Sequence, residues 1–362
     1  MKKYLTMAVF LLILGGFFIR NITATPLGVL QSERRAPAAW PELNVQTVVS
    51  GEFMNGFEPW AADNFAGRDK LREVRSKFIF DVFRQSDKSG LYLGESGAGK
   101  FEKINEQSAR KVAEKIGKVA GGLEGLNIYY AIVPDKSLYA GRYLPGFDID
   151  MARNILGEQL EDVEYIDLTG ALESHNFYRT DIHWAQPGLS GVLDALGDAM
   201  DFEVDKNFDM HNAGDFHGVY TGQIALPLKP DEMIYMTSPT IGSAVVSYLN
   251  DRTGKMYEGQ MYNIEEITGR DPYALFLCGT QPLITIENLY CEEQRELYIF
   301  RDSFTSSLAP LLTSAYSKIT LIDLRYIDSR VLPQVVKFTP GSDVLFLYGM
   351  QILNNESILL VN

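Results

Sequence analysis

The sequence predicts an α/β fold in which helices flank a parallel sheet, with a β-rich insertion at about residues 201–275. Continuous apolar runs at 127–133, 318–324 and 344–348 are typical of strands buried on both faces of a parallel sheet. Between these runs, apolar residues recur at the spacing of an amphipathic helix. Strands that alternate with helices in this way indicate βαβ units.

Composition excludes some classes of function. The chain has 362 residues, 46% of them hydrophobic and 22% charged, as in a globular protein of one large domain or two smaller ones. Its formal net charge is −14. Nucleic-acid binding depends on neutralising phosphates with Lys and Arg, so no nucleic-acid partner is expected.

The N-terminus has the pattern of an export signal. Lys2 and Lys3 precede an apolar run at 4–19, which Arg20 closes. The run is slightly shorter than the ~20 residues that span a bilayer. We expect residues 1–20 to be a signal anchor, and a cleaved signal peptide is the alternative. Both place the rest of the chain outside the cytoplasm, in agreement with the positive-inside rule.

The remaining elements follow in chain order. Residues 21–60 are expected to be a linker and lead-in, and residues 61–362 one catalytic domain that contains the insertion. Helices are expected at 58–83, 104–119, 151–160, 187–200, 305–316 (with a possible kink at Pro310) and 331–337, and strands at 127–133, 163–168, 297–300, 318–324 and 344–348.

A glycine-rich segment, 94–100, matches the Gly-x4-Gly-Lys frame of a phosphate-binding loop. That motif needs Ser or Thr next to hold a magnesium ion, and Phe101 stands there instead. A glycine turn between two β segments is therefore expected in place of a nucleotide site.

Cysteine and the scattered histidines add little chemistry. Cys278 and Cys291 flank a strand-like stretch, and either a disulfide or two buried free thiols fits them. The remaining histidines give no familiar metal-ligand spacing: His175, His211 and His217, the last two with Asp215 between them. Neither a metal nor a cofactor is predicted.

One short stretch carries a catalytic pattern. Asp181 and His183 lie two residues apart, next to Trp184. An imidazole titrates near neutral pH and can take a proton from a serine, while a carboxylate fixes its tautomer. Ser303 is expected at the turn between strand 297–300 and the helix after it, where the helix amides can stabilise an oxyanion.

Each of these residues also has a structural interpretation. Serine is a common helix N-cap, and His183 fits a core histidine bonded to Asp181. Trp184 fits packing as well as substrate contact. Spacing alone therefore leaves the triad open.

The stretch 180–184 resembles the Thr-Asp-His-His-Trp signature of the bacterial DHHW protein family, with Ile182 in place of the first histidine. That family is similar to the SGNH-hydrolase-like domains of alginate O-acetyltransferases. Further motifs sit where the family has similar ones: residues 33–35, 63–69, 90–94, 302–304 and 322–326.

The resemblance implies roles for individual residues. Asp181, His183 and Ser303 would be orienter, base and nucleophile, and Ile182 leaves His183 as the single base. Arg325 would be a substrate or oxyanion candidate, with an ion pair at the strand end as the alternative.

The resemblance also implies an extracytoplasmic, SGNH-like enzyme anchored by residues 1–20. It would add acetyl groups to a cell-envelope or secreted polysaccharide, or remove them. A membrane-bound acyl-donor protein would be a plausible partner. A non-catalytic envelope or carbohydrate-binding protein on the same fold is the alternative.

Overall fold

A computed structural model describes residues 2–23, 28–30, 33–94, 97–141, 147–250, 252–288, 290–291 and 294–361. The chain divides into two compact units, which are described separately. The first contains Met1–Ser89 and Val219–Leu228, and the second Gly90–Gly218 and Lys229–Asn362.

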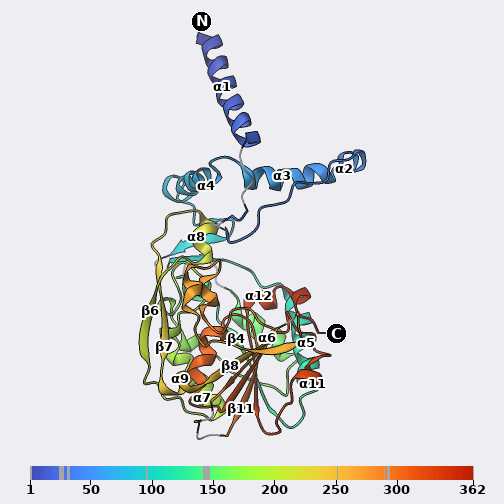
Figure 1. The fold of residues 1–362 in the computed structure, drawn as a ribbon, viewed down its shortest axis with the longest axis vertical. Helices are drawn as coiled ribbons and strands as arrows, with labels where there is room; N and C mark the ends of the chain where they lie inside the picture. The colour runs from blue at the N-terminus through green and yellow to red at the C-terminus, as the bar shows by residue number, and fades with distance from the viewer. Residues whose placement is uncertain are drawn as a thin grey trace. The chain divides into compact units, whose positions relative to one another are not determined.

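The first unit begins with a long apolar helix, α1 (Lys2–Thr23) (Figure 1). Within it, Lys3–Asn21 is long and apolar enough to cross a membrane, and none of it is buried. Among the described residues this is the one helix that meets those criteria. An anchor and a signal sequence share these properties.

The single helix expected at 58–83 is wrong, because the helix is interrupted at residues 65–67. α3 (Glu52–Asn64) ends at an extended residue, and Gly67 then takes a left-handed φ of 75° before the next helix starts. The other elements of this unit are α2 (Val45–Ser50), α4 (Arg68–Lys77), a π-helical turn η2 (Phe78–Val82), β1 (Asp87–Lys88) and α8 (Val219–Ile224).

Two of the family-like motifs meet in this unit. Arg35 binds both carboxylate oxygens of Asp63 at 2.6 Å each. Glu33 pairs with Arg68 and, at 2.8 Å, with Arg72. The hydrogen bonds from Arg35 lower the pKa of Asp63 below its ordinary value. These motifs therefore have a structural role in joining the lead-in to the helices.

The second unit is built on an eight-stranded sheet with the order β5-β4-β13-β11-β12-β10-β8-β9 (Figure 1). The pairs from β5 to β12 are parallel, and those from β12 to β9 are antiparallel. The strands are β4 (Asn127–Val133), β5 (Glu164–Tyr165), β8 (Val245–Asn250), β9 (Lys255–Glu258), β10 (Leu283–Glu287), β11 (Glu296–Arg301), β12 (Lys318–Ile322) and β13 (Asp343–Gly349).

Helices α5 (Glu106–Ala120) and α6 (Ile149–Gly157) share one hydrophobic core with the sheet. Asn105 caps α5 by accepting a hydrogen bond from the Ser108 N–H at 3.1 Å. The helix buries residues at the 3–4 spacing of one face, as its sequence predicts. Phe300 and Phe346 pair across β11 and β13 with stacked rings. This core fixes the strand ends where the candidate site lies.

Several predicted elements are shorter than expected. Only Glu164–Tyr165 of the run 163–168 pairs as a strand. The expected helix 305–316 is α10 (Thr305–Leu308) followed by a 3₁₀ turn, because Pro310 has no N–H to continue the α-helix. The other helices are α7 (Ser190–Met200), α9 (Pro239–Ser243), α11 (Leu332–Val335) and α12 (Met350–Leu353).

Short 3₁₀ turns join these elements and carry several residues of the site. They are η3 (Lys136–Tyr139), η4 (Thr169–Ala171), η5 (Ser174–Asn176), η6 (Gln186–Gly188), η7 (Ile264–Thr268), η8 (Pro272–Leu275), η9 (Ala309–Leu312) and η10 (Glu356–Ile358).

The region expected as a β-rich insertion contributes strands in two places. β6 (Asp209–Phe216) and β7 (Asp231–Thr237) form a separate antiparallel pair. β8 and β9 extend the main sheet beside β10. The predicted α/β class with a mainly parallel sheet flanked by helices is confirmed.

The glycine-rich segment is a hairpin of β2 (Leu91–Gly94) and β3 (Gly97–Lys100). Glu95 and Ser96 of the phosphate-loop frame lie outside the described residues. A Cβ at Gly99 would meet the Tyr92 ring at 2.3 Å, and the Lys100 ammonium pairs with Glu102. The glycine is thus explained by packing of a β hairpin.

Candidate active site

Ser303 follows the end of β11, in a tight turn formed by its neighbour. The Asp302 carboxylate accepts hydrogen bonds from the N–H of Phe304 at 3.0 Å and of Gly349, at the end of β13, at 2.7 Å. The first of these closes a turn over Ser303. Burial raises the pKa of Asp302. The serine is partly exposed above this buried carboxylate.

Residues 178–183 form a narrow loop and not a strand. Phe177 and Trp184 pair as an antiparallel bridge, and the Tyr178 N–H donates to the His183 carbonyl at 3.1 Å. At the tip, Asp181 Oδ1 lies 2.6 Å from His183 Nδ1 and also accepts from the His183 N–H at 3.2 Å. The loop itself thus brings carboxylate and imidazole together.

The structure brings all three sequence-predicted residues into contact. His183 Nε2 lies 2.8 Å from Ser303 Oγ, on the opposite side of the ring from Asp181. The side chain of Asp181 is 3% exposed and that of His183 is 14% exposed. A carboxylate can only accept, so Nδ1 carries a hydrogen and Nε2 is left to accept from the serine hydroxyl.

Aromatic rings hold the imidazole in place. Tyr273, in η8, stacks on His183 with ring centroids 3.8 Å apart and planes at 9°. Phe304 packs against the ring from another direction at 5.0 Å. The Tyr273 hydroxyl donates to Ser307 Oγ at 2.9 Å. Rotation of the imidazole away from Ser303 is therefore restricted by packing.

Trp184 lies beneath the site and is fully buried. Its indole N–H donates to the Phe304 carbonyl at 2.9 Å and to Ser307 Oγ at 3.0 Å. The indole therefore joins the loop of Asp181 to the segment after Ser303. The sequence left packing and substrate contact open for Trp184, and these contacts correspond to packing.

Two charged side chains, buried Lys136 and half-buried Asp231, hold the backbone of the loop. The Lys136 ammonium donates to the carbonyls of Tyr178 and Arg179, at 2.6 and 3.2 Å, and to that of Ala98 at 2.7 Å. Asp231 accepts from the N–H groups of Arg179 at 2.7 Å and Thr180 at 2.8 Å, and from the Thr180 hydroxyl at 2.6 Å. The loop is thus bound through carbonyls and N–H groups alike.

Two glycines allow other segments to approach the loop closely. A Cβ at Gly97, whose φ is 106°, would lie 2.2 Å from the Arg179 carbonyl oxygen. A Cβ at Gly218 would lie 2.3 Å from the Thr180 carbonyl oxygen and 2.4 Å from Asp181 Cβ. Any larger residue at these positions displaces the loop.

Burial lowers the pKa of Lys136 to about 8, although nearby carboxylates oppose the shift. The unfolded chain holds this proton up to about pH 10.4. Between pH 8 and pH 10.4 the unfolded state binds more protons than the folded state. Lys136 therefore lowers the free energy of unfolding at pH 7, and this destabilisation decreases as the pH rises from 8 towards 10.4. Deprotonation also leaves two N–H donors for three carbonyls.

We therefore expect turnover to fall by up to about tenfold above pH 8 while the fold stays intact, since each lost hydrogen bond weakens the loop by about 1 kcal/mol. The pH–rate profile and the melting temperature should be measured together for wild type and Lys136→Met. The variant should lack the alkaline decline near pH 8. Lys115→Met is a matched control, because Lys115 donates to carbonyls of Glu356 and Leu359 elsewhere. An unchanged alkaline limb in Lys136→Met would contradict this role.

Arg325 is committed to an ion pair. Its Nε and Nη2 contact the two carboxylate oxygens of Asp323 at 2.9 and 2.6 Å. Burial opposes the charge, but the bonds to Asp323 raise the pKa of Arg325. Arg325 also contributes favourable charge to buried Asp302. In this arrangement it stabilises the carboxylates below Ser303.

The helix expected to aim its dipole at the site is only the four-residue α10, too short for a substantial macrodipole. The Phe304 N–H is already used by Asp302. Within the described part of the chain, the N–H of Ser303 donates to no protein acceptor. It is the available backbone donor beside the hydroxyl.

The other candidates lie apart from this arrangement. His211 Nε2 contacts the Thr237 hydroxyl at 2.8 Å, and exposed His175 contacts Glu173 at 3.3 Å. Cys278 and Cys291 are free thiols. The described residues contain no group of three or more possible metal ligands, including around His217.

Sequence reasoning missed Lys136, Asp231 and Tyr273. Lys136 and Asp231 act on backbone atoms of a distant loop, and no spacing rule marks such a contact. Tyr273 lay in the region interpreted as an insertion. The sequence offered one signal for Lys136. It follows closely after the apolar strand 127–133, at a position that is buried, and a buried lysine needs partners.

Comparison with solved structures identifies the fold. A DHHW family protein from Eubacterium siraeum DSM 15702 matches with a TM-score of 0.62 at 19% sequence identity, over 75% of this chain and 94% of that one. The chain has the DHHW fold. Bacillus cereus PatB1 matches with a TM-score of 0.58 at 16% identity, over 75% and 99% of the two chains.

These matches confirm the predicted resemblance to the DHHW protein family at the level of the α/β fold. PatB1 is also known with a sulfonyl adduct, and that structure matches over 76% of this chain. No protein-family model and no curated protein sequence matches the chain. Identities this low establish the shared fold alone.

Proposed function

We propose that this chain is a serine-dependent acyl-transfer enzyme that adds acetyl groups to a cell-envelope or secreted polysaccharide, or removes them. The observation that carries the proposal is the contact series Asp181–His183–Ser303, at 2.6 and 2.8 Å. A serine is a weak nucleophile until an adjacent base takes its proton. These three side chains have the order and the hydrogen-bonding arrangement that such activation needs.

In the first half-reaction His183 Nε2 takes the hydroxyl proton as Ser303 Oγ forms a bond to the acyl carbonyl carbon. Asp181 stabilises the resulting imidazolium. The Ser303 N–H is the first donor for the developing oxyanion. When the tetrahedral intermediate collapses, the bond to the donor breaks, and His183 returns the proton to the leaving group.

In the second half-reaction an acceptor hydroxyl gives its proton to His183 and attacks the acyl-serine carbonyl. Collapse breaks the bond to Ser303 Oγ, which regains its proton. A sugar hydroxyl as acceptor makes the enzyme an O-acetyltransferase, and water makes it an esterase. Exclusion of water from the site decides between them.

The cellular setting belongs to the same proposal. The α1 helix would anchor the enzyme with its catalytic unit outside the cytoplasm, and the two lysines before the apolar segment agree with that orientation. A membrane-bound protein would then supply the acyl group.

Reaction with phenylmethanesulfonyl fluoride tests the nucleophile. A sulfonyl group reacts with activated serines, so a stoichiometric adduct should form on the peptide that contains Ser303. Peptide mass spectrometry locates the adduct, and Ser190→Ala is the control for an exposed serine. If no adduct forms, or if it forms on another residue, the proposed serine mechanism is wrong, and the alternative of a non-catalytic carbohydrate-binding protein is favoured. Mass analysis of envelope glycans with and without the protein tests the acceptor.

A further inference from the structure

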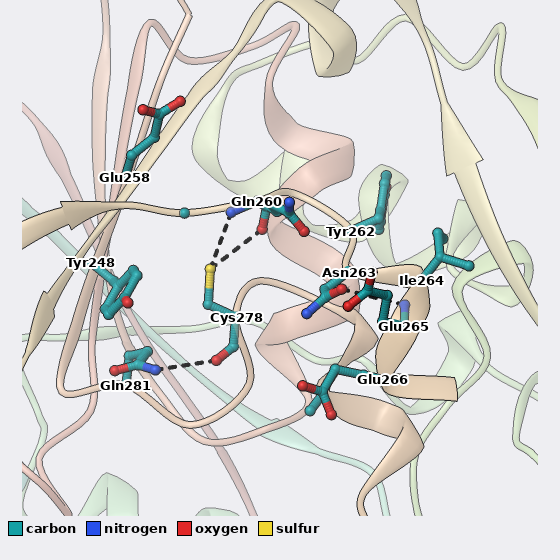
Figure 2. Close-up of a pocket in the computed structure, with 12 residues that line it drawn as sticks. Tyr248, Glu258, Gln260, Tyr262, Asn263, Ile264, Glu265, Glu266, Cys278 and Gln281 are labelled. Carbon is teal, nitrogen blue, oxygen red and sulfur yellow. Dashed lines mark hydrogen bonds between the residues drawn. The ribbon is translucent and has the colours of Figure 1, made fainter. Parts of the chain in front are cut away.

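A polar pocket of about 630 Å³ lies in the second unit (Figure 2). Its size falls in the range of small-molecule sites. The pocket is formed by β8, β9, the segment after β9, and the chain between η8 and β10. The lining residues are Tyr248, Glu258, Gly259, Gln260, Tyr262, Asn263, Ile264, Glu265, Glu266, Ala274, Cys278 and Gln281.

The lining has the chemistry of a site for a polyhydroxylated ligand. Tyr248 and Tyr262 supply aromatic surface, and amides and carboxylates supply hydrogen-bond acceptors for hydroxyl groups. Figure 2 shows Tyr248 and Gln281 on one side of the view, with Asn263 and Glu266 on the other. Amide side chains also donate, so both halves of a sugar hydroxyl can be satisfied.

The charge of the pocket narrows the ligand further. Three glutamates line it, and no lysine or arginine does. The three carboxylates would repel an anionic ligand, whereas they would not repel a neutral sugar and would attract an ammonium group.

One short segment separates the pocket from the catalytic imidazole. Tyr273 stacks on His183, while the adjacent Ala274 lines the pocket. Ring contacts continue from Tyr273 to Phe276 at 5.2 Å and from Phe276 to the pocket wall Tyr262 at 5.9 Å.

Hydrogen bonds make the same connection. Gln186 donates to the Tyr262 hydroxyl at 3.2 Å and to the Ser307 carbonyl at 2.8 Å. Arg301, two residues before Ser303, donates to the Gly279 carbonyl at 3.3 Å, next to Cys278 of the lining. The pocket and the nucleophile thus rest on one packed framework.

We propose that this pocket is the acceptor subsite and that it binds glycan units without negative charge, neutral or amino sugars, while excluding uronate- or phosphate-bearing polymers. The proposal rests on the acyl-transfer function proposed above.

Binding titrations with the full chain test this subsite. The probes are tetramers of glucosamine, N-acetylglucosamine and galacturonate, measured by calorimetry. We expect the first two to bind at least tenfold more tightly than the third. In Glu265→Gln/Glu266→Gln this preference should shrink at least fivefold, because the amides keep the shape and remove the charge. Exposed Glu124→Gln is the matched control, and equal melting temperatures establish folding.

A second readout separates this proposal from the catalytic one. Turnover of 4-nitrophenyl acetate requires Ser303 and no glycan, so the double variant should keep its activity on this ester while it loses at least fivefold on a glucosamine glycan, whose ammonium groups the carboxylates attract. If the wild type binds the galacturonate tetramer as tightly as the other two tetramers, the proposed subsite is wrong. It is also wrong if the double variant loses equal activity on the glycan and on the ester. If the wild type binds glycans but does not turn over the ester, the proposed enzyme activity is wrong and the proposed subsite is retained.

Discussion

Replacing Ser303 by Ala is expected to lower kcat for a chromogenic acetyl ester by at least about 10⁴-fold. Loss of the nucleophile leaves only binding and oxyanion stabilisation, and in serine hydrolases removal of this one residue costs nearly as much as removal of the whole triad. The side chain is small and partly exposed, so the fold should tolerate the change. Steady-state kinetics and a melting curve measure the two effects.

Ser190→Ala serves as the matched variant, since Ser190 is exposed at the start of α7. It should retain the wild-type rate. If Ser303→Ala kept more than about a hundredth of the activity with an unchanged melting temperature, the mechanism through an acyl-serine would be wrong.

Asp181→Asn is expected to lower kcat/KM by about 10⁴-fold at neutral pH. An asparagine can donate its amide N–H to His183 Nδ1, which places the ring proton on Nε2. Nε2 then has no lone pair to accept the proton of Ser303, from which it lies 2.8 Å. Kinetics across a pH range, with the melting temperature as the check on folding, measure the effect.

Exposed Asp215→Asn is the control for a carboxylate removed at a distance from the site. A purely structural role for Asp181 predicts a different pattern. In that case the melting temperature falls, and the activity of the folded fraction stays near that of wild type.

The sequence predicted which residues meet at the candidate site better than the contacts that hold them there. Ser303 was found because it follows an apolar strand, and Asp181 and His183 because a carboxylate stands two residues before an imidazole in a stretch that resembles the DHHW signature. Lys136 and Asp231 hold the loop at 178–183 mainly through hydrogen bonds to its backbone atoms. Any residue type can supply such atoms, so no side-chain pattern at 178–180 reveals the partner.

Element boundaries failed where single residues override periodicity. Apolar spacing continues through 58–83, but the chain becomes extended at Phe65, where α3 ends, and Gly67 takes a left-handed conformation before α4 begins. Pro310 similarly limits α10 to one turn. Buried strands were located well, because a run such as Asn127–Val133 has no alternative that satisfies its backbone and its apolar side chains together.

The strand order has a consequence for how the chain matures. β13 is the last of the eight strands in chain order, yet it lies between β4 and β11 and supplies the Gly349 N–H that holds Asp302. Until β13 is made, two edges that belong at the centre of the sheet stay unpaired. The nascent chain therefore can neither fold with full cooperativity nor form the candidate site early in its synthesis. In the proposed export of the chain, such late closure would keep the polypeptide unfolded until it has crossed the membrane.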